Sequence, residues 1–532
     1  AQAVQAPAAL SRVFLPCALV SRAAGRPLYR VTDSVPDTSA TEPITSCTSF
    51  SPRMDKLNLH NIDNSSKSQD KSLVKSDGKM NGKGAPCSCR CAIAIIIFIV
   101  HIISYADRFN ISVAILTMSE EYGYSSETQG LIMAAFFYGY IITQVVAGAV
   151  STPTSVVGPK WCLIFACTVW SVVTLLTPAC AHVSLGLLIG ARVVLGLAEG
   201  LYVPSTTALY SNWFPAEERA RITALGSCGQ NMGSVIAMAC SPVVAQNWRI
   251  MFYVFGWLGL AWAVLFAFFG AAGPERHWAI SEEEKDYIIR CREHDEGAVV
   301  NSMASTQTSY DTIETPDGKV MEQQKEAPYW RIGMQPAFWA VAAAHFACTW
   351  SSYILLSWLP KYYVSAFNVT KAHSGTIAIW PYVAAAVAVL SWGKFFDTAM
   401  ETEYLGVLRA RKLAQAIGGL GPICAFVVIL CAGNRSLSLT ATMVTVAVAL
   451  QTASLSGFAV NFLDIGGQAN ACRVAALSNT LATVPGFVGN ILVGHLIDGH
   501  GGWPAVFATI IGIHLIGFLA FLAMAKATPV RF

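Results

Sequence analysis

The chain has 532 residues, a length that in soluble proteins usually corresponds to several domains, but its composition excludes that organisation. Charged residues make up 13% and apolar residues 54% of the chain, against about 25% and roughly 45–50% in typical globular proteins. The charged residues are too few to form the polar surfaces of several soluble domains. Most of the chain must therefore be surrounded by lipid. The net charge of +3 gives no indication of nucleic-acid binding. We therefore expect a membrane protein and no soluble enzyme.

Residues 1–91 form a polar extension, rich in Ser, Pro and Ala, that we interpret as a targeting or disordered segment. Residues 1–30 contain four arginines and neither acid nor lysine, which is typical of a transit peptide. The chain does not begin with Met, and Met54 is a candidate start. Sequons at Asn368 and Asn434 fit a secretory route equally well. The plastid envelope, the plasma membrane and endomembranes therefore all stay open as locations.

Beyond residue 91, apolar stretches of membrane-spanning length recur to the end of the chain. Runs such as 94–100 lack the alternation of a barrel strand, so the predicted fold class is an all-α polytopic membrane protein. Twelve transmembrane helices are expected, at roughly 92–117, 128–150, 160–180, 183–210, 221–245, 250–272, 336–362, 372–396, 408–432, 437–460, 473–497 and 503–526.

The expected helices form two groups of six. An N-terminal half (92–272) and a C-terminal half (336–526) flank a charged loop (273–335), and residues 527–532 form a tail. Two hexads joined by a long polar loop are typical of parallel repeats about an axis along the membrane normal. Counted from residue 71 onward, the segments on the side of the N-terminus carry 22 Lys and Arg, against four in the loops of the other side. Both termini and the central loop are therefore expected on the cytoplasmic or equivalent side.

Four ionisable residues interrupt the apolar helices: Asp107 and Arg108 in the first span, Arg192 and Glu199 in the fourth. On insertion scales each costs about 2.5–3.5 kcal/mol at mid-membrane, so such residues normally face a cavity or a partner. Arg192 and Glu199 are seven residues apart, so they project from the same face of their helix, roughly 10 Å apart. In a structural interpretation, Asp107 neutralises Arg192 and Arg108 neutralises Glu199, and the pairs only hold the helices together.

In the functional interpretation, the same four residues handle an anion and a proton. Arg108 and Arg192 bind the anionic substrate, because a planar guanidinium matches carboxylate or phosphate. Asp107 and Glu199 couple transport to protons, because a carboxylic acid in a low-dielectric cavity can exchange a proton near neutral pH. A proton on Glu199 would free a neighbouring arginine for the substrate.

Polar residues in other helices could complete the substrate site, although each alone more often forms a helix–helix hydrogen bond. The candidates are Tyr138 in the second span, Gln230 in the fifth and Asn479 in the eleventh. The sequence contains no metal-ligand cluster, phosphate-binding loop or nucleophile elbow. We therefore expect no metal, no organic cofactor and no enzymatic activity; the coupling ion would be H⁺, with Na⁺ as the alternative.

Several local motifs combine these residues with their neighbours. They are 107–114 (DRFNISVA), 136–140 (FFYGY), 192–200 (RVVLGLAEG), 213–221 (WFPAEERAR), 354–360 (ILLSWLP), 477–480 (LSNT) and 485–486 (PG). Together they resemble the anion:cation symporter branch of the major facilitator superfamily, which contains sodium/phosphate, sialic acid, vesicular glutamate and plastid phosphate carriers. The resemblance covers about residues 92–526 and implies a twelve-helix rocker-switch carrier for an organic or inorganic anion.

The resemblance also implies residue roles. Arg108 and Arg192 match anion-handling arginines, and Asp107 and Glu199 match the proton-coupling acids of bacterial sugar-acid members. Gln230 and Asn479 fall near substrate-contacting positions. The sequence departs from the family pattern at 148–153, which lacks the usual acidic and basic residues, and at two positions where glutamate carriers have His and Arg. Those two positions are Met133 and Cys348, so glutamate is disfavoured as the substrate.

We therefore predict secondary active transport of a small anion (phosphate, a sugar acid or another carboxylate) by alternating access, coupled to protons. The expected protein is a monomer in the lipid bilayer whose partner is a small anionic substrate, and it binds no nucleic acid. A sodium-dependent phosphate symporter is the alternative within transport. A non-transporting membrane sensor or a channel is the alternative of a different class.

Overall fold

The described part of the chain is almost entirely helical. A computed structural model describes residues 89–150, 158–292, 327–499 and 501–530. The predictions for residues 1–88 with Met54, for the loop at 151–153 and for most of the central loop lie outside these ranges. By its internal contacts the chain divides into residues 1–83 and 84–532, and every helix below belongs to the second unit.

The N-terminal half is built from long helices, and capping residues encode the starts of two of them. Ser184 accepts a hydrogen bond from the backbone N–H of Leu187, and Asn247 accepts one from that of Arg249, so each satisfies a free donor at a helix start. The helices are α2 (Cys89–Tyr122), α3 (Ser126–Val150), α4 (Gly158–Val183), α5 (Leu185–Glu199), α6 (Tyr202–Trp213), α7 (Ala216–Ala239), α8 (Ser241–Gln246) and α9 (Trp248–Phe269), followed by the 3₁₀ turn η1 (Pro274–Arg276).

The fourth expected span is broken into α5 and α6, a feature that the apolar pattern does not predict. Pro204 lies in the first turn of α6, where its missing N–H is tolerated, while its ring disfavours a helical carbonyl four residues earlier, at Gly200. The break therefore falls directly after Glu199, which becomes the last residue of α5.

The C-terminal half contains a second set of long helices, with Thr370 and Ser436 as side-chain caps of α13 and α16. Between spans ten and eleven the chain turns at Gly467, whose φ of 58° suits glycine. The elements are α11 (Tyr329–Gly333), α12 (Pro336–Phe367), α13 (Lys371–Ala378), α14 (Trp380–Glu401), α15 (Val407–Ala432), η2 (Gly433–Arg435), α16 (Leu437–Gln451), the π-turn η3 (Leu455–Ala459), α17 (Val460–Asp498) and α18 (Gly502–Met524).

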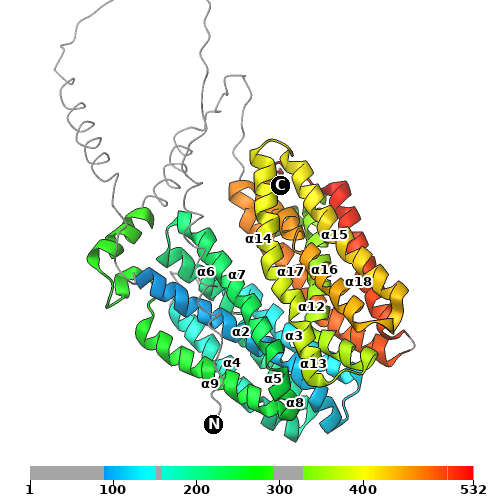
Figure 1. Cartoon of the computed structure of the whole chain (residues 1–532). Helices are drawn as coiled ribbons and strands as arrows, with labels where there is room; N and C mark the ends of the chain where they lie inside the picture. Colours follow the sequence, from blue (N-terminus) through cyan, green and yellow to red (C-terminus); the bar gives the residue numbers. More distant parts are fainter. Residues whose placement is uncertain (1–88, 151–157, 293–326, 500, 531–532) are drawn as a thin grey trace, which may run out of the picture. The chain divides into compact units, whose positions relative to one another are not determined.

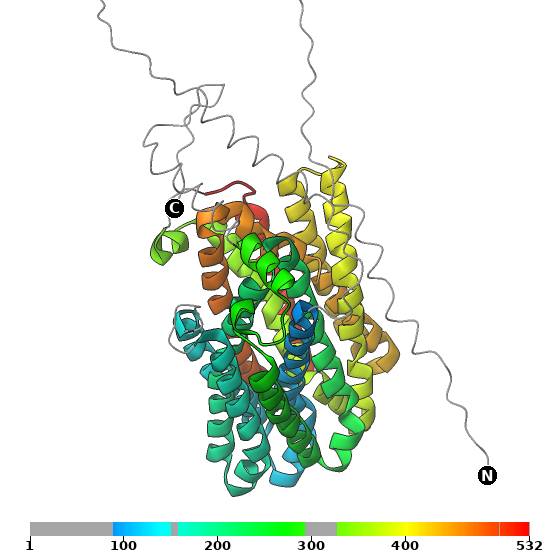
Figure 2. The same cartoon turned by 90° about the vertical axis from the view of Figure 1, so that its left-hand side faces the viewer.

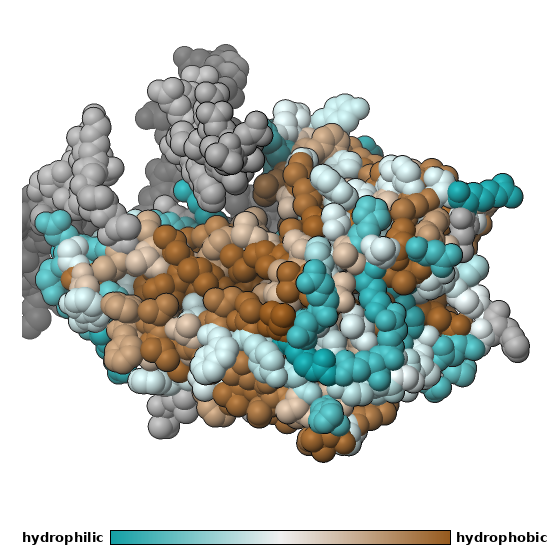
Figure 3. All heavy atoms as spheres, turned by 60° about the horizontal axis from the view of Figure 1, so that its bottom comes forward, coloured by the Kyte–Doolittle hydropathy of each residue, from teal (hydrophilic) through white to brown (hydrophobic). Residues whose placement is uncertain are grey.

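Ten segments of the described chain are long and apolar enough to cross a membrane. They coincide with ten of the twelve expected spans, and α3 and α7 coincide with the other two. In the two views of Figures 1 and 2 the long helices run side by side. On the face shown in Figure 3, apolar side chains form a broad continuous area, as lipid contact requires. The all-α, multi-pass membrane fold is thus confirmed.

Glycines set the close packing of α3 on α5. A Cβ added at Gly139 would lie 2.0 Å from the carbonyl oxygen of Val193, and one added at Gly196 would lie 1.9 Å from that of Phe136. Neither position can hold a side chain without moving the backbones apart, so small residues bring these two helices together within the membrane. The contact places Phe136 of α3 beside the charged face of α5.

The two halves meet mainly where α3 packs along α17, with smaller contacts of α2 on α12 and of α8 on α13. Polar bonds join them near the ends of α3, α12 and α17 that the charge distribution assigns to the outer side. Lys361 Nζ donates to Ser126 Oγ (2.7 Å) and Gln129 Oε1 (2.8 Å), and the Glu127 N–H donates to Asp498 Oδ2 (2.8 Å). The outer ends of the halves are therefore held together in this conformation.

Candidate functional site

The structure brings Arg108 and Glu199 together as a buried ion pair between α2 and α5. Arg108 Nε and Nη2 both donate to Glu199 Oε2, at 2.8 and 2.5 Å. Arg108 is 5% exposed and Glu199 is fully buried. Ser104, one turn before Arg108, lies within 3.4 Å of the same carboxylate oxygen. One half of the structural interpretation, neutralisation of Glu199 by Arg108, therefore describes this conformation.

Asp107 has a different hydrogen-bond partner from the one that the sequence pattern suggests. Neighbouring residues on a helix point about 100° apart, so Asp107 faces α4 while Arg108 faces α5. Thr174 Oγ1 of α4 donates to Asp107 Oδ2 at 2.5 Å. The other carboxylate oxygen, Oδ1, is buried without a hydrogen-bond partner among the described residues.

Arg192 is 3% exposed and lies close enough to Asp107, Glu199 and Arg108 to interact with each electrostatically. Its Nε is buried and, within the described ranges, has no hydrogen-bond acceptor; Glu199 Oε1 likewise has no donor there. The four sequence-predicted ionisable residues thus form one cluster. Within it one ion pair is complete, and three polar atoms can still bond to a proton, a ligand or a rearranged partner.

Aromatic rings surround the Arg108 guanidinium. Its central carbon lies 4.9 Å from the ring centre of Tyr105, 4.8 Å from Phe136 and 5.0 Å from Tyr140. Phe136 also lies 5.4 Å from the Arg192 guanidinium, so one ring contacts both arginines. The faces of aromatic rings stabilise a cation such as guanidinium without neutralising its charge.

Sequence reasoning does not identify these aromatic side chains as site residues. Tyr105 could have been found, because it precedes Arg108 by three residues and so shares its helix face. Thr174 carries no such signal, since a threonine in an apolar helix usually bonds within its own helix.

The Arg108 side of the cluster faces the C-terminal half. Tyr353 of α12 lies close enough to Arg108, Tyr105 and Tyr140 for electrostatic interaction. Its ring centre is 4.7 Å from that of Phe137, the residue after Phe136 on α3. Arg108 therefore lies where the two halves of the molecule meet.

The remaining three predicted substrate residues lie on α3, α7 and α17 and are not part of the charged cluster. Tyr138 is 39% exposed, on a stripe of α3 with exposed Leu131 and Ile142, and stacks on Phe487 of α17. Gln230 is half-buried on α7 beside Tyr202. Asn479 is exposed on α17. The structure thus brings together the charged residues, while the roles of the three polar residues stay predictions.

The centre of the C-terminal half holds a neutral hydrogen-bond network instead. Ser351 Oγ of α12 bonds both Gln451 Oε1 of α16 and His514 Nε2 of α18, each at 2.9 Å. Gln451 Nε2 donates to Ser352 Oγ and to the carbonyl oxygen of Cys348, at 2.8 and 2.7 Å. Over the described ranges, no group of three His, Cys, Asp or Glu side chains is arranged to hold a metal ion.

Comparison with known proteins identifies the fold and the family. The profile of the Major Facilitator Superfamily matches residues 97–489, which is more than half of the chain. The inward open xylose transporter XylE from E. coli superimposes with a TM-score of 0.60, over 83% of this chain and 96% of that chain, at 14% identity. This likeness supports the fold alone.

Three curated relatives lie within one branch of that superfamily. Sialin of Homo sapiens is 30% identical, over 84% of this chain and 92% of the relative. The chloroplastic ascorbate transporter of Arabidopsis thaliana is 32% identical, over 83% and 76%. The chloroplastic sodium-dependent phosphate transport protein 1 of the same plant is 31% identical, over 80% and 77%. The chain therefore belongs to the Major Facilitator Superfamily, in its anion:cation symporter branch.

Proposed function

We propose that this chain transports a small anion across a membrane by alternating access, driven by protons. The observation that carries the proposal is the buried Arg108–Glu199 pair, which lies at the meeting of the two halves with Arg192 and Asp107 beside it. If the Arg108–Glu199 pair only held the helices together, there would be no reason for Arg192 and Asp107 to be buried beside it with unpaired polar atoms. Burying such groups is costly, so they normally serve a ligand pathway or a proton relay.

The first step follows from the geometry of that pair. Both N–H groups that Arg108 directs at Glu199 reach a single oxygen, Oε2. A proton on Glu199 removes the negative charge that holds them, so Arg108 can turn these two donors to a carboxylate or phosphate of the substrate. Proton and anion then bind together. The proton neutralises Glu199, which would otherwise be left without Arg108, and the anion pairs with Arg108, which would otherwise be left without Glu199.

Arg192 and Asp107 supply the second step. Arg192 offers a buried Nε without a partner among the described residues, and Asp107 offers Oδ1. Arg192 can take the Glu199 carboxylate once the proton leaves, or hold the second anionic oxygen of the substrate. Asp107 remains hydrogen-bonded to Thr174, and its negative charge keeps the net charge of the cluster small while the anionic substrate enters.

Alternating access requires that the outer contacts of Lys361 and Asp498 break while the Arg108 site stays intact. Those contacts lie near helix ends, where water can replace each bond. The charged cluster is instead shared by α2, α4 and α5 of one half, so it can move as one body with that half.

The substrate class that the site favours is a monoanion with a neutral body. Arg108 faces Tyr353 of α12, a helix whose single Lys or Arg is Lys361 near its outer end, and on the same helix Cys348 occupies the position at which glutamate carriers have an arginine. One positive end suits one carboxylate or phosphate group. The names of the relatives, which include an ascorbate and a phosphate transporter, are consistent with this class. Because two of these relatives are chloroplastic, a plastid membrane is the location that we propose.

Uptake into proteoliposomes tests the proposal. Purified protein is reconstituted, and accumulation of labelled phosphate, ascorbate, a sugar acid, sialic acid and glutamate is measured with an imposed pH gradient. We expect accumulation of at least one monoanion above electrochemical equilibrium, its loss when a protonophore collapses the gradient, and little glutamate uptake. Accumulation that follows a sodium gradient and ignores the protonophore would instead establish the sodium-driven alternative. Flux that only equilibrates would contradict secondary active transport and favour the channel alternative.

A further inference from the structure

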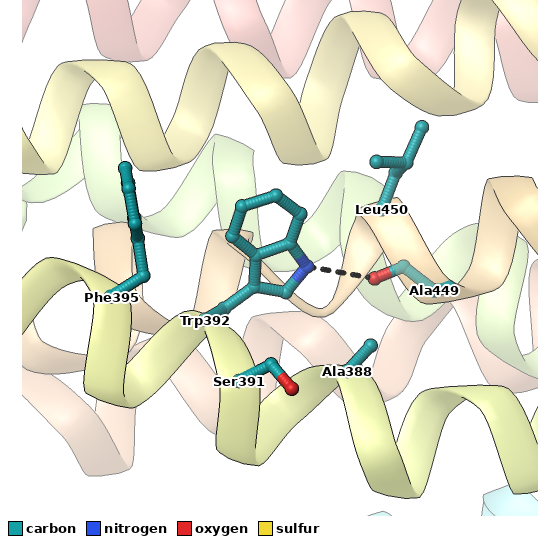
Figure 4. A pocket seen from close by; sticks show the side chains of 6 residues that line it. All are labelled: Ala388, Ser391, Trp392, Phe395, Ala449 and Leu450. Atoms are coloured by element: carbon teal, nitrogen blue, oxygen red, sulfur yellow. Dashed lines mark hydrogen bonds between the residues drawn. The ribbon is translucent and has the colours of Figure 1, made fainter.

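A groove on the C-terminal half lies outside the machinery described above. It holds about 300 Å³ between α14 and α16 and is lined by apolar side chains, apart from one hydroxyl. Trp392 Nε1 donates to the carbonyl oxygen of Ala449 at 3.2 Å, so the indole spans the groove and fixes its floor (Figure 4). The lining residues are Ala388, Ser391, Trp392, Phe395, Ala449 and Leu450.

The groove lies on the side of α16 that is turned away from α12. Gln451 of α16 bonds to α12, whereas Leu450 packs against Gly421 of α15 and Ala449 bonds to Trp392 of α14. Because successive helical residues are turned by about 100°, Ala449 and Leu450 line the side of α16 that is remote from α12. Since α12 carries Tyr353 toward the arginine site, the groove lies on the far side of α16 from that site.

α14 also has the least covered surface among the candidate spans. In the most apolar window of its span, residues 371–401, 22% of the residues are buried, against 33–61% in the other nine. Exposed Val387 and Leu390 flank the groove-lining positions. A large apolar surface of this kind must be covered by acyl chains in a bilayer.

The same face of α14 becomes polar toward the end that we assign to the cytoplasmic side. A second groove of about 530 Å³ shares Ser391 and Phe395 with the first, so the two are continuous. It adds one cation and three hydroxyl groups, from Lys394, Thr398, Thr402 and Tyr404. Ser391, Lys394 and Thr398 follow one face of α14, and Thr402 and Tyr404 lie just beyond its last residue, Glu401. Ser391 and Thr402 are roughly 16 Å apart along the axis.

Lys394 gives this polar end its charge preference. It is exposed and has no ion pair among the residues that the structure describes; Asp397 and Glu401 of the same helix do not line the groove. Lys394 lies seven residues before the end of α14, roughly 10 Å inside it, so its side chain extends toward the membrane surface. At that depth the available anions are lipid phosphates.

We propose that the α14–α16 groove binds one anionic phospholipid of the cytoplasmic-side leaflet. An acyl chain lies along Trp392 and Leu450, and the headgroup phosphate accepts hydrogen bonds from Lys394 and the threonine hydroxyls. The groove has an apolar part and a cationic end, and an anionic lipid matches both. A soluble anion would leave the apolar part of the groove uncovered, and a neutral sterol would leave Lys394 unpaired. Lipid binding at this site is independent of the transported substrate.

Native mass spectrometry of the full chain in detergent tests the proposal, with phosphatidylglycerol as probe and phosphatidylcholine of the same acyl chains as the comparison. We expect phosphatidylglycerol to be retained roughly fivefold more, and Lys394→Gln to remove most of that preference. Ala388→Phe, which fills the apolar part, should lower the retention of both lipids. Arg409→Gln is the matched control, because Arg409 is an exposed cation at the adjoining start of α15 that does not line either groove.

Equal retention of the two lipids, or an unchanged preference in Lys394→Gln, would overturn the proposal. A reduction of the preference by Arg409→Gln as strong as that by Lys394→Gln would also overturn it, because the effect would then reflect general surface charge. Preferential retention of cholesterol over phosphatidylglycerol would assign the groove to a sterol instead. Because Lys394 is exposed, its replacement should leave the fold intact, and an unchanged melting temperature checks this.

Discussion

The centres of the two halves show the same architecture with opposite chemistry. In the N-terminal half, α2 and α5 carry four buried ionisable residues in one cluster. In the C-terminal half, α12, α16 and α18 together carry a single Lys or Arg, Lys361 near the outer end, and no acid. Their centre is satisfied by neutral bonds among Ser351, Gln451 and His514. The C-terminal half does bury an ion pair, Arg411–Asp464, but it joins α15 to α17 and not the three helices α12, α16 and α18. The difference indicates a division of roles, in which the centre of one half handles charge and the centre of the other supplies a neutral surface.

The sharpest way to break this comparison is Arg192→Ala. Among the described residues Arg192 completes no hydrogen bond through Nε, so its removal should leave the Arg108–Glu199 pair in place while removing a positive charge from the substrate route. We expect uptake to fall by roughly 100-fold or more, corresponding to about 3 kcal/mol for a buried charge, with the protein still monodisperse by size exclusion. Wild-type uptake by this variant would contradict the assignment of charge handling to the N-terminal half.

Glu199→Gln separates coupling from binding. The amide mimics a permanently protonated acid and leaves Arg108 available, so gradient-driven uptake should fall by roughly 100-fold, the lower end for losing a proton-transferring side chain. Exchange of internal for external substrate should stay within about twofold, since the anion site remains. Equal loss of both activities would show that Glu199 acts in binding or folding and not in coupling. Glu121→Gln, at the outer ion pair with Arg249, is the matched control.

Gln451→Leu tests the uncharged hydrogen-bond network at the centre of the C-terminal half. It removes the bonds to Ser351, Ser352 and Cys348 without changing charge, so we expect a lower melting temperature from the loss of roughly 1–3 kcal/mol. Proton coupling should persist, with a rise in KM of about threefold at most. A loss of gradient-driven uptake as severe as that of Glu199→Gln would remove the contrast between the halves.

Lys361→Ala should have the smallest effect on transport. It breaks two outer bonds to α3, which water can replace, so uptake should stay within about twofold. Hydrogen–deuterium exchange at the start of α3 and the end of α17 should nevertheless increase, because the outer ends separate more often. Unchanged exchange there would indicate that glycine contacts, such as that of Gly130 with Asn490, hold the outer ends instead.

Much of the fold follows from local pattern. Apolar length locates the spans, and Ser184 and Asn247 fix two helix starts through their side-chain caps. Ser281 likewise caps the helical segment that begins at residue 282, by accepting from the Glu284 N–H. The break after Glu199 is encoded by Pro204 but hidden within a continuous apolar run. Rings such as Tyr105 share a helix face with Arg108, whereas Phe136 and Tyr353 reach it only through packing between helices.

Composition and helical period alone establish that ionisable residues lie within apolar helices and that Arg192 and Glu199 share a face. These are local properties, because solvent preference and the turn per residue act along a single helix. The choice of partners was decided by packing: Asp107 bonds Thr174 and Arg108 takes Glu199, across separations of 67 and 91 residues. Which carboxylate meets which cation depends on how closely α2, α4 and α5 approach, and that approach is set by glycines and bulky side chains from distant parts of the chain.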